Sequence, residues 1–256
     1  MDQSSERSQA DQQRYRELLL AHLAGRELKE ILFFVNPRRF ELLRKSIGDL
    51  LQRSETRVLN VAGGPFALEF YLAGRQADIT SIDIDPALPD LHAALLAEGL
   101  IAGSTHHTSD VLTYEPQGSY DLIIINDLLY SRAVDFTAIL EKYRHHLSPG
   151  GVLYFDILDQ RASAVWRAFN KDARFRRYSI DAVRGQLQGA GFRIESEQPS
   201  FGIKGGLDAL ARRLLFRIFG IANNVVFKAR RKAATGIVAA FVSLLLGIDY
   251  LAVELG

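Results

Sequence analysis

The amino-acid sequence predicts an α/β fold in which a doubly wound, mostly parallel sheet has helices on both faces. Short apolar strands alternate with helical segments from residue 57 onward, and such alternation implies right-handed crossovers between parallel strands. The first strand ends in a turn containing Gly63-Gly64-Pro65, and the second strand ends on Asp83 and Asp85. Glycines let the backbone approach a ligand, a helix N-terminus offers free N–H groups, and a carboxylate accepts hydrogen bonds from ribose hydroxyls. This arrangement is typical of a nucleotide-binding unit.

The composition narrows the class of protein. At 256 residues the chain is long enough for one large domain with extensions, and its formal net charge of +1 gives no general attraction to nucleic acid. The chain contains no cysteine, which excludes disulfides and thiolate metal sites and fits a reducing compartment. The N-terminus (MDQSSERSQADQQRYRE) contains no apolar signal-peptide core. We therefore expect a cytoplasmic enzyme with no metal site and no nucleic-acid partner.

The N-terminal part predicts helices ahead of the sheet. Residues 1–11 are polar and charged, and we expect them to be disordered. Apolar residues then recur at helical spacing over residues 13–34, where Gly25 divides the pattern into two pieces. Asn36-Pro37 opens a further helix, with the asparagine as its cap and the proline in its first turn. Residues 12–54 are therefore predicted to form helices that cover one edge of the sheet.

The central part predicts alternating strands and helices. The expected strands are Val58–Val61, Ile79–Ile84, Thr105–Ser109, Tyr120–Asn126, Val152–Leu158 and Gly191–Glu197. The expected helices are Phe66–Ala73, Ala87–Glu98, Phe136–His146 and Ser179–Gln188. The nearly continuous apolar run after Tyr120 is typical of a parallel strand that is buried on both faces. The turn Ser148-Pro149-Gly150-Gly151 is expected to end the preceding helix.

Residues 201–256 differ in composition and predict a basic and apolar helical extension. The segment Leu207–Lys232 interleaves arginines and lysines with apolar residues, and Ala233–Ile248 contains no charge. The uncharged run is shorter than the roughly 20 residues that cross a membrane. One interpretation is that these helices pack on the core and roof a lipophilic pocket. The other is that residues 207–256 attach the protein to a membrane surface. Tyr250–Leu255 is the only candidate for a final strand.

Five motifs, each at a strand end, resemble the class I S-adenosylmethionine (SAM)-dependent methyltransferases. They are VLNVAGG, ITSIDIDP, HTSDVLTY, YDLIIINDLLY and HLSPGGVLYFDI, and they span about residues 55–200. The resemblance implies a Rossmann-like SAM-binding domain over these residues. It also implies that the helices of residues 12–54 could form a lid over cofactor and substrate, as an alternative to covering the sheet edge alone.

The same resemblance implies the cofactor contacts. The turn after the first strand would line the methionine and ribose portion of SAM, and Asp83 would hold the ribose hydroxyls. Asp110 would accept from the adenine amino group, with Ile84 and Val111 on the two faces of the ring. An ordinary solvated aspartate is the alternative for each acid. The expected cofactor-binding residues are Asn60, Ala62, Gly63, Gly64, Asp83, Ile84, Asp110, Val111 and Asn126.

The first motif departs from the family pattern at three positions. The family usually has an acid where Asn60 stands, and glycines where Ala62 and Phe66 stand. We expect the lost acid to weaken a contact with the methionine end of SAM. We also expect Phe66 to place bulk close to the cofactor. These departures motivate a further hypothesis, that the protein is methyltransferase-like but transfers no methyl group and serves as a binding partner or for another reaction.

The catalytic residues are less clearly indicated. Methyl transfer needs an oriented nucleophile and, for a hydroxyl acceptor, a base. Asp127 and Tyr130 follow the fourth strand and are the predicted catalytic residues; Arg132, His22, His106 and His107 are weaker candidates. No NPPY-type motif follows this strand, which argues against nucleobase or glutamine amino groups as acceptors. The predicted function is SAM-dependent methylation of a small or lipophilic molecule at oxygen, and the alternative is a membrane-associated methyltransferase of a lipid, quinone or membrane-linked glycan.

Overall fold

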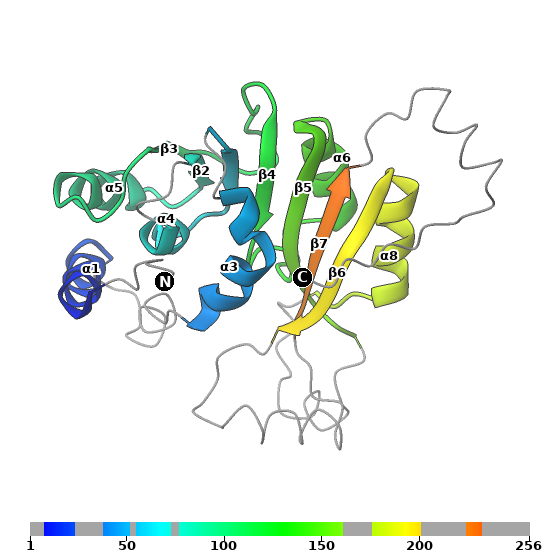
Figure 1. Cartoon of the computed structure of the whole chain (residues 1–256), viewed down its shortest axis with the longest axis horizontal. Coiled ribbons are helices and arrows are strands. Elements are labelled where there is room, and N and C mark those ends of the chain that lie inside the picture. Colours follow the sequence, from blue (N-terminus) through cyan, green and yellow to red (C-terminus); the bar gives the residue numbers. More distant parts are fainter. Residues whose placement is uncertain are drawn as a thin grey trace, which may run out of the picture. The chain divides into compact units, whose positions relative to one another are not determined.

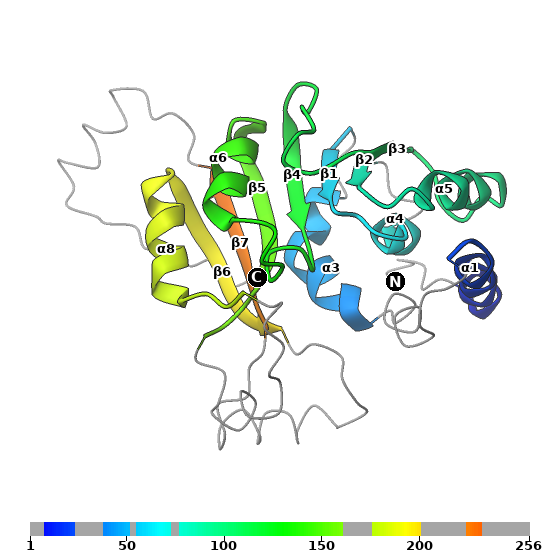
Figure 2. The same cartoon turned by 180° about the vertical axis from the view of Figure 1, so that it is seen from behind.

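The computed structural model describes residues 8–23, 38–51, 55–72, 77–160, 176–200 and 224–231. The chain divides into two compact units, residues 1–115 and 116–256, which we take in turn. Within the described residues, seven strands make up a mixed sheet with accompanying helices (Figures 1 and 2). The predicted Rossmann-like α/β fold is therefore confirmed.

The first unit contains three parallel strands in the order β3-β2-β1. The strands are β1 (Arg57–Val61), β2 (Asp78–Asp83) and β3 (Ser104–Thr108), and the helices between them are α4 (Ala67–Leu72) and α5 (Leu88–Ala97). Val61 pairs with Ile82 and Asp83 with Thr108, so the carboxyl ends of the strands meet at one edge of the sheet. This register brings the glycine turn after β1 beside the aspartate that ends β2.

Among the described residues, two helices precede β1. Helix α1 (Gln9–His22) begins at the Ser8 cap, whose side-chain oxygen accepts from the backbone N–H of Asp11 at 3.0 Å. The expectation of disorder through residue 11 is therefore wrong for residues 9–11, because a polar first turn is stabilised by its cap. The helix predicted after Pro37 is α3 (Arg38–Leu51), in which Leu43, Ile47 and Leu50 are buried. The lid function of these helices stays a prediction.

The core of the first unit joins α1 to the helices that follow β1 and β2. Apolar side chains of α1 and α5 pack in one cluster with the residues around the glycine turn. The rings of Tyr15 and Phe70 stack with centroids 4.2 Å apart. The buried members are Tyr15, Leu18, Leu19, Leu23, Phe66, Ala67, Phe70, Leu88, Leu91, Leu95, Leu100 and Ile101. Helix α1 is thus an integral part of this core.

The second unit contains four strands in the order β4-β5-β7-β6. They are β4 (Tyr120–Ile125), β5 (Leu147–Leu158), β6 (Phe192–Ser200) and β7 (Asn224–Arg231), with helices α6 (Phe136–Arg144) and α8 (Ile180–Gly189). Strands β4 and β5 are parallel, whereas β7 runs antiparallel to both β5 and β6. In Figure 1 the orange arrow of β7 lies between β5 and β6.

Strand β5 begins earlier than its apolar run suggests. The predicted turn Ser148-Pro149-Gly150-Gly151 is wrong as a helix-ending loop, because these residues belong to the strand. Pairing with β4 shifts register between Tyr120 and Leu122, which accommodates the extra residues as a bulge. A Cβ on Gly151 would lie 2.9 Å from the carbonyl oxygen of Ser148, so only glycine fits this close backbone approach.

Strand β7 corrects the prediction of a helical extension over residues 201–256. Residues 224–231 form a strand, in which Phe227 and Ala229 are buried while Lys228 and Arg230 are partly exposed. This alternation has the period of a strand. The alternative final strand, Tyr250–Leu255, and the uncharged run Ala233–Ile248 lie outside the described residues. Among the helices that the structure describes, none is long and apolar enough to cross a membrane.

Candidate functional site

The turn between β1 and α4 has an unusual backbone. Ala62, Gly64 and Phe66 have φ values of 54°, 57° and 61°, which is the left-handed region that favours glycine. The turn is tied to β2, because the Gly63 N–H donates to the carbonyl oxygen of Ile82 at 3.0 Å. The chain therefore keeps the alternating left-handed conformation even where alanine and phenylalanine replace glycine. Each non-glycine residue in this region costs about 1–2 kcal/mol, a cost typical of functional turns.

Asp83 lies directly beside this turn. Its Oδ2 accepts from the Gly64 N–H at 2.9 Å, and its Oδ1 accepts from the Asp85 N–H at 3.0 Å. A carboxylate has about four lone-pair sites, so a half-buried one that accepts two backbone bonds can still accept from a ligand. The next residue, Ile84, is 65% exposed, which is unusual for a large apolar side chain. Together they present a hydrogen-bond acceptor and an apolar surface at the end of β2.

Asp110 and Val111 follow β3 in the same unit. The Asp110 side chain is exposed and its Oδ1 accepts from the Leu112 N–H at 2.7 Å, which organises the turn after the strand. Val111 is buried at 7% exposure. The structure thus brings together the strand ends that carry the predicted residues from Asn60 to Val111. Their contacts with a cofactor stay predictions.

A buried polar cluster lies beneath the turn, and two of its members, Ser81 and Glu69, were missed by sequence reasoning. Asn60, Ser81 and Glu69 are each no more than 4% exposed. The Asn60 Nδ2 donates to Glu69 Oε1 at 3.0 Å, and the Ser81 hydroxyl donates to the same oxygen. Glu69 stands in the first turn of α4 within the apolar run FALEFYLA, and an acid surrounded by apolar residues was the available signal.

Phe66 stands at the end of the turn, where the family usually has glycine. Its side chain is fully buried, and its ring centroid lies 4.8 Å from that of His92 and 5.1 Å from that of His106. The left-handed backbone at Phe66 accompanies burial of the ring in the core of the first unit, and an effect of Phe66 on cofactor binding stays a prediction.

Of the two histidines beside Phe66, His92 is buried and His106 is partly buried. The His92 Nε2 lies 3.0 Å from the Ser104 hydroxyl, whereas the Nδ1 of His106 is buried without a hydrogen-bond partner among the described residues. Burial lowers the pKa of His92, and neighbouring His106 lowers it further. Burial also lowers the pKa of His106, against the opposing charge of Asp83. Both side chains are thereby favoured as neutral imidazoles.

In the second unit, Asn126 and Asp127 follow β4. Asp127 has a φ of 57°, and its N–H donates to Asp156 Oδ1 at 2.7 Å. Asp156 lies near the end of β5, is 6% exposed, and was missed by sequence reasoning; an acid in the apolar run VLYFDIL was the signal. Asn126, Asp127 and Tyr130 are partly exposed. A buried carboxylate therefore fixes the backbone of the predicted catalytic residue Asp127.

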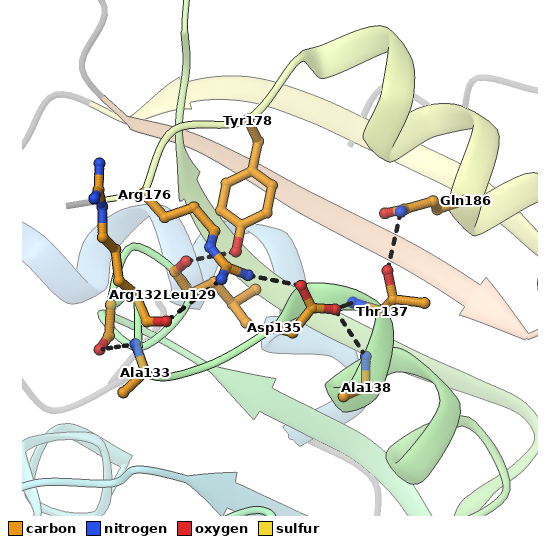
Figure 3. A network of polar contacts seen from close by, with 10 residues as sticks. Leu129, Arg132, Ala133, Asp135, Thr137, Ala138, Arg176, Tyr178 and Gln186 are labelled. Atoms are coloured by element: carbon orange, nitrogen blue, oxygen red, sulfur yellow. Dashed lines mark hydrogen bonds and ion pairs between the residues drawn. The ribbon is translucent and has the colours of Figure 1, made fainter. Parts of the chain in front are cut away.

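A polar network holds the rest of this loop (Figure 3). The Tyr178 hydroxyl donates to the Leu129 carbonyl oxygen at 2.7 Å. The backbone N–H of Arg176 donates to the Tyr130 carbonyl oxygen, also at 2.7 Å. The Arg176 guanidinium binds Asp135 Oδ2 at 2.7 Å and also reaches the Arg132 carbonyl oxygen. Figure 3 shows Arg176 directed at Asp135, which caps α6 through the N–H groups of Thr137 and Ala138. Residues 176–178 thus brace the loop that carries Tyr130.

The described residues contain no group of three or more histidines, aspartates or glutamates arranged to hold a metal ion. Of the weaker catalytic candidates, His22 ends α1 and His107 lies on β3, so both belong to the first unit, whereas Arg132 belongs to the second. In the Figure 3 network, the Arg132 carbonyl oxygen accepts from Arg176.

Comparison with known proteins gives a consistent result. A family model described as a methyltransferase domain matches residues 35–197. Among solved structures, the N-methyltransferase NodS from Bradyrhizobium japonicum, in complex with S-adenosyl-L-homocysteine, has a TM-score of 0.56 at 17% identity and covers 85% of this chain and 98% of its own. The magnesium protoporphyrin IX methyltransferase of Synechocystis, also with this ligand, has a TM-score of 0.60 at 15% identity, with 88% and 95% covered.

A third solved structure is similar in the same way. The glycopeptide N-methyltransferase MtfA has a TM-score of 0.53 at 15% identity, and the match covers 74% of this chain and 89% of that one. Among curated proteins, none matches the sequence significantly. Sequence identities as low as those of the three solved structures show a shared fold and nothing more. The match to the family model is stronger evidence, because it covers more than half of the chain.

Proposed function

The chain belongs to the SAM-dependent methyltransferases, and from this premise we propose that it methylates a small or lipophilic acceptor at an oxygen atom. The assignment of oxygen as the methylated atom rests on one observation, the position of Asp127. Asp127 stands two residues after the end of β4, and its backbone N–H donates to the buried Asp156 carboxylate, which supports a role for Asp127 as the base. A hydroxyl acceptor must lose a proton during methyl transfer, whereas a neutral amine can attack with its lone pair.

The residues present fit the cofactor. SAM, when bound, supplies a methyl group on a positively charged sulfur. Asp83 retains lone pairs for ribose hydroxyls, Ile84 offers an exposed apolar face to an adenine ring, and the exposed Asp110 can accept from an amino group. At the turn, a Cβ on Gly63 would meet Asn60 Nδ2 at 2.8 Å, so glycine is needed there for the turn to pack against the buried Asn60 side chain.

Within this proposal the chain's own residues position and deprotonate the acceptor. Tyr130 is a polar, partly exposed group on the same loop as Asp127 and can orient an acceptor hydroxyl, while Asn126, also partly exposed, is expected to contact the cofactor. Asp127 takes the hydroxyl proton, and Asp156 keeps the Asp127 backbone in its left-handed conformation while this occurs. Arg176 and Tyr178 hold the loop from the other side.

Cofactor binding is tested by calorimetric titration with S-adenosylhomocysteine. We expect micromolar binding, about −8 kcal/mol, that Asp83→Ala abolishes. The matched control is Asp78→Ala, which removes an exposed carboxylate at the opposite end of the same strand. Loss of binding in both variants would show that the effect is not specific to the predicted ribose contact.

The oxygen assignment is tested by an acceptor screen that pairs hydroxyl compounds with their amine analogues. Release of S-adenosylhomocysteine is measured for wild type, for Asp127→Asn and for Asp121→Asn, a control at the start of the same strand. We expect hydroxyl acceptors to react and Asp127→Asn to lower kcat about 100-fold, since a general base contributes at least this much. Turnover of amines alone, or full activity in Asp127→Asn, would contradict the proposal.

The membrane-associated alternative rests on the uncharged run Ala233–Ile248. Its test must leave β7 intact, because residues 224–231 pair with two strands of the sheet. We therefore compare binding to anionic lipid vesicles by the full chain and by a chain ending at Lys232. Equal partitioning of the two would count against a membrane acceptor presented through this segment.

A further inference from the structure

The acid that the first motif lacks has a counterpart nearby. The family resemblance calls for an acid at position 60, where this chain has asparagine. Nine residues later Glu69 extends from the first turn of α4 back to that asparagine, and its Oε1 accepts from Asn60 Nδ2 at 3.0 Å. The same oxygen accepts from the hydroxyl of Ser81 on β2. One carboxyl group therefore links β1, β2 and α4 beneath the turn.

The cluster touches the turn directly. A Cβ built on Gly63 would lie 2.8 Å from Asn60 Nδ2, 3.1 Å from Asn60 Cγ and 3.3 Å from the Ser81 hydroxyl oxygen. The Gly63 backbone thus rests on the two side chains that Glu69 holds. A shift of either side chain would change the height of the turn above the sheet, because protein interiors are closely packed and transmit such shifts.

Glu69 itself is poorly satisfied for an ionised group. It is 1% exposed, and its Oε2 is buried without a hydrogen-bond partner among the described residues. Burial raises the pKa of Glu69, against the hydrogen bonds from Ser81 and Asn60. A neutral carboxylic acid still accepts through Oε1, so the geometry is compatible with a protonated side chain.

We propose that Glu69 is a positioning residue for the cofactor turn, which it shapes by holding Asn60 and Ser81 beneath Gly63. The inference rests on the proposed function, because the turn is the one that would receive the methionine end of SAM. In this proposal Glu69 on α4 takes the place of the acid that β1 lacks. Its carboxyl group supports the turn from below and does not contact the cofactor.

The first test compares two replacements of Glu69 in titrations with S-adenosylhomocysteine. Glu69→Gln keeps the acceptor oxygen and a neutral group, so its Kd should stay within about threefold of wild type. Glu69→Met keeps the length but removes the acceptor, and should raise Kd at least about tenfold. Leu68→Met, also buried on α4, controls for a new methionine in this helix. Unchanged binding by folded Glu69→Met overturns the inference, as does equal loss in both Glu69 variants.

A second variant keeps the test decisive if Glu69→Met fails to fold. Asn60→Asp places two carboxyl groups within hydrogen-bond distance, so they must share one proton. Binding by this variant should weaken as pH rises from 5 to 8. The double variant Asn60→Asp/Glu69→Gln should remove this pH dependence of binding. The side-chain amide introduced at position 69 can then donate a hydrogen bond to the carboxylate introduced at position 60. A purely structural role would leave the pH profile of Asn60→Asp parallel to that of wild type, and that result overturns the inference.

Binding of S-adenosylhomocysteine by the wild-type protein distinguishes failure of the proposed function from failure of the positioning role of Glu69. If the wild-type protein does not bind S-adenosylhomocysteine, the cofactor part of the proposed function fails and takes the role of Glu69 with it. If wild type binds and Asp83→Ala does not, while Glu69→Met binds normally, the function stands and only the positioning role is overturned.

Discussion

The Tyr15 hydroxyl donates a hydrogen bond to the Pro65 carbonyl oxygen at 2.8 Å, which ties helix α1 to the glycine turn 50 residues later in the chain. Tyr15 is fully buried and Pro65 stands between the left-handed residues Gly64 and Phe66. The N-terminal helix therefore supports the cofactor turn from the side of the helical core, whereas Glu69 supports it from the side of the sheet.

Tyr15→Phe should lower the free energy of unfolding by about 1 kcal/mol, because it removes one buried hydrogen bond and leaves the Pro65 oxygen unsatisfied. The ring stack on Phe70 is retained. Urea unfolding followed by circular dichroism measures the change. Leu20→Ala, an exposed position on the same helix, is the control and should change stability by no more than about 0.5 kcal/mol.

The left-handed turn makes opposite predictions for two neighbouring positions. Ala62→Gly should leave stability unchanged or raise it by up to about 1 kcal/mol, since glycine adopts a φ of 54° without strain. Gly64→Ala should lower it by about 1–2 kcal/mol at a φ of 57°. Thermal unfolding of both variants measures the difference. Similar losses in both would show that strain does not govern this turn.

The lowered pKa of the partly buried His106 predicts acid sensitivity. Burial lowers the pKa of His106 in the folded protein, while the unfolded chain binds its proton near the ordinary value of about 6.5. As pH falls below that value the unfolded state takes up protons that the folded state does not, so the free energy of unfolding falls. His106→Gln should make this dependence shallower between pH 7 and 5.5. Thr105→Gln, exposed on the same strand, introduces the same side chain without removing a titratable group and should keep the wild-type slope.

The hydrogen bond from Tyr178 to the loop after β4 is expected to affect catalysis as well as stability. Tyr178→Phe frees the Leu129 carbonyl oxygen, and should cost about 1 kcal/mol of stability. Because the loop also carries Asp127, we expect kcat for methyl transfer to fall while the KM for SAM stays unchanged. Gln186→Ala is the control, since Gln186 joins the same network through Thr137 without contacting the loop. Full activity in Tyr178→Phe would exclude a positioning role for this bond.

Replacing Glu195 on β6 by a neutral residue is expected to lower the free energy of unfolding substantially. Its side chain is only 4% exposed and contacts Lys228 at 3.0 Å, Arg193 at 3.3 Å and Arg230. Burial alone would raise the pKa of Glu195, but the bonds and charges of Arg230 and Lys228 lower it. Glu195→Gln should therefore lower the free energy of unfolding by about 2 kcal/mol, less than for fully buried pairs because the cations are partly hydrated.

Glu197→Gln on the same strand is the matched control for Glu195. Its carboxylate pairs with Arg184 and is more exposed, at 23%, so its loss should be about 0.5–1 kcal/mol. Because the pKa of Glu195 is depressed, its stabilising contribution is present above its ordinary pKa of about 4.5 and disappears as pH falls further. Urea unfolding at pH 7 and pH 3 distinguishes the two variants.

The strands and their polar ends were predictable because each has a local pattern. Residues 120–125 form an unbroken apolar run, and Asp83 stands where a parallel strand ends. For Glu69 and Asp156 the sequence marks a buried acid in an apolar run, but their contacts were not predictable, since their partners Ser81 and Asp127 are distant in sequence. Their roles depend on tertiary contacts, which no local pattern encodes.

Two other features were not predicted, for different physical reasons. The segment 224–231 (NVVFKARR) lies within a basic and apolar stretch whose pattern also suits an amphipathic helix. It forms strand β7 because it pairs with two neighbouring strands, β5 and β6. At Phe66, a positive φ accompanies a ring buried in the core, and the sequence does not show which of its residues adopt this conformation.

The position of β7 between β5 and β6 has a consequence for the order of events during synthesis. Strand β6 is made before β7, but it joins the sheet by pairing with β7. The second unit therefore cannot close until Arg231 has left the ribosome, and until then the edge of β5 is open to pairing with other chains. Translation that stalls before residue 231 should yield aggregation-prone nascent chains.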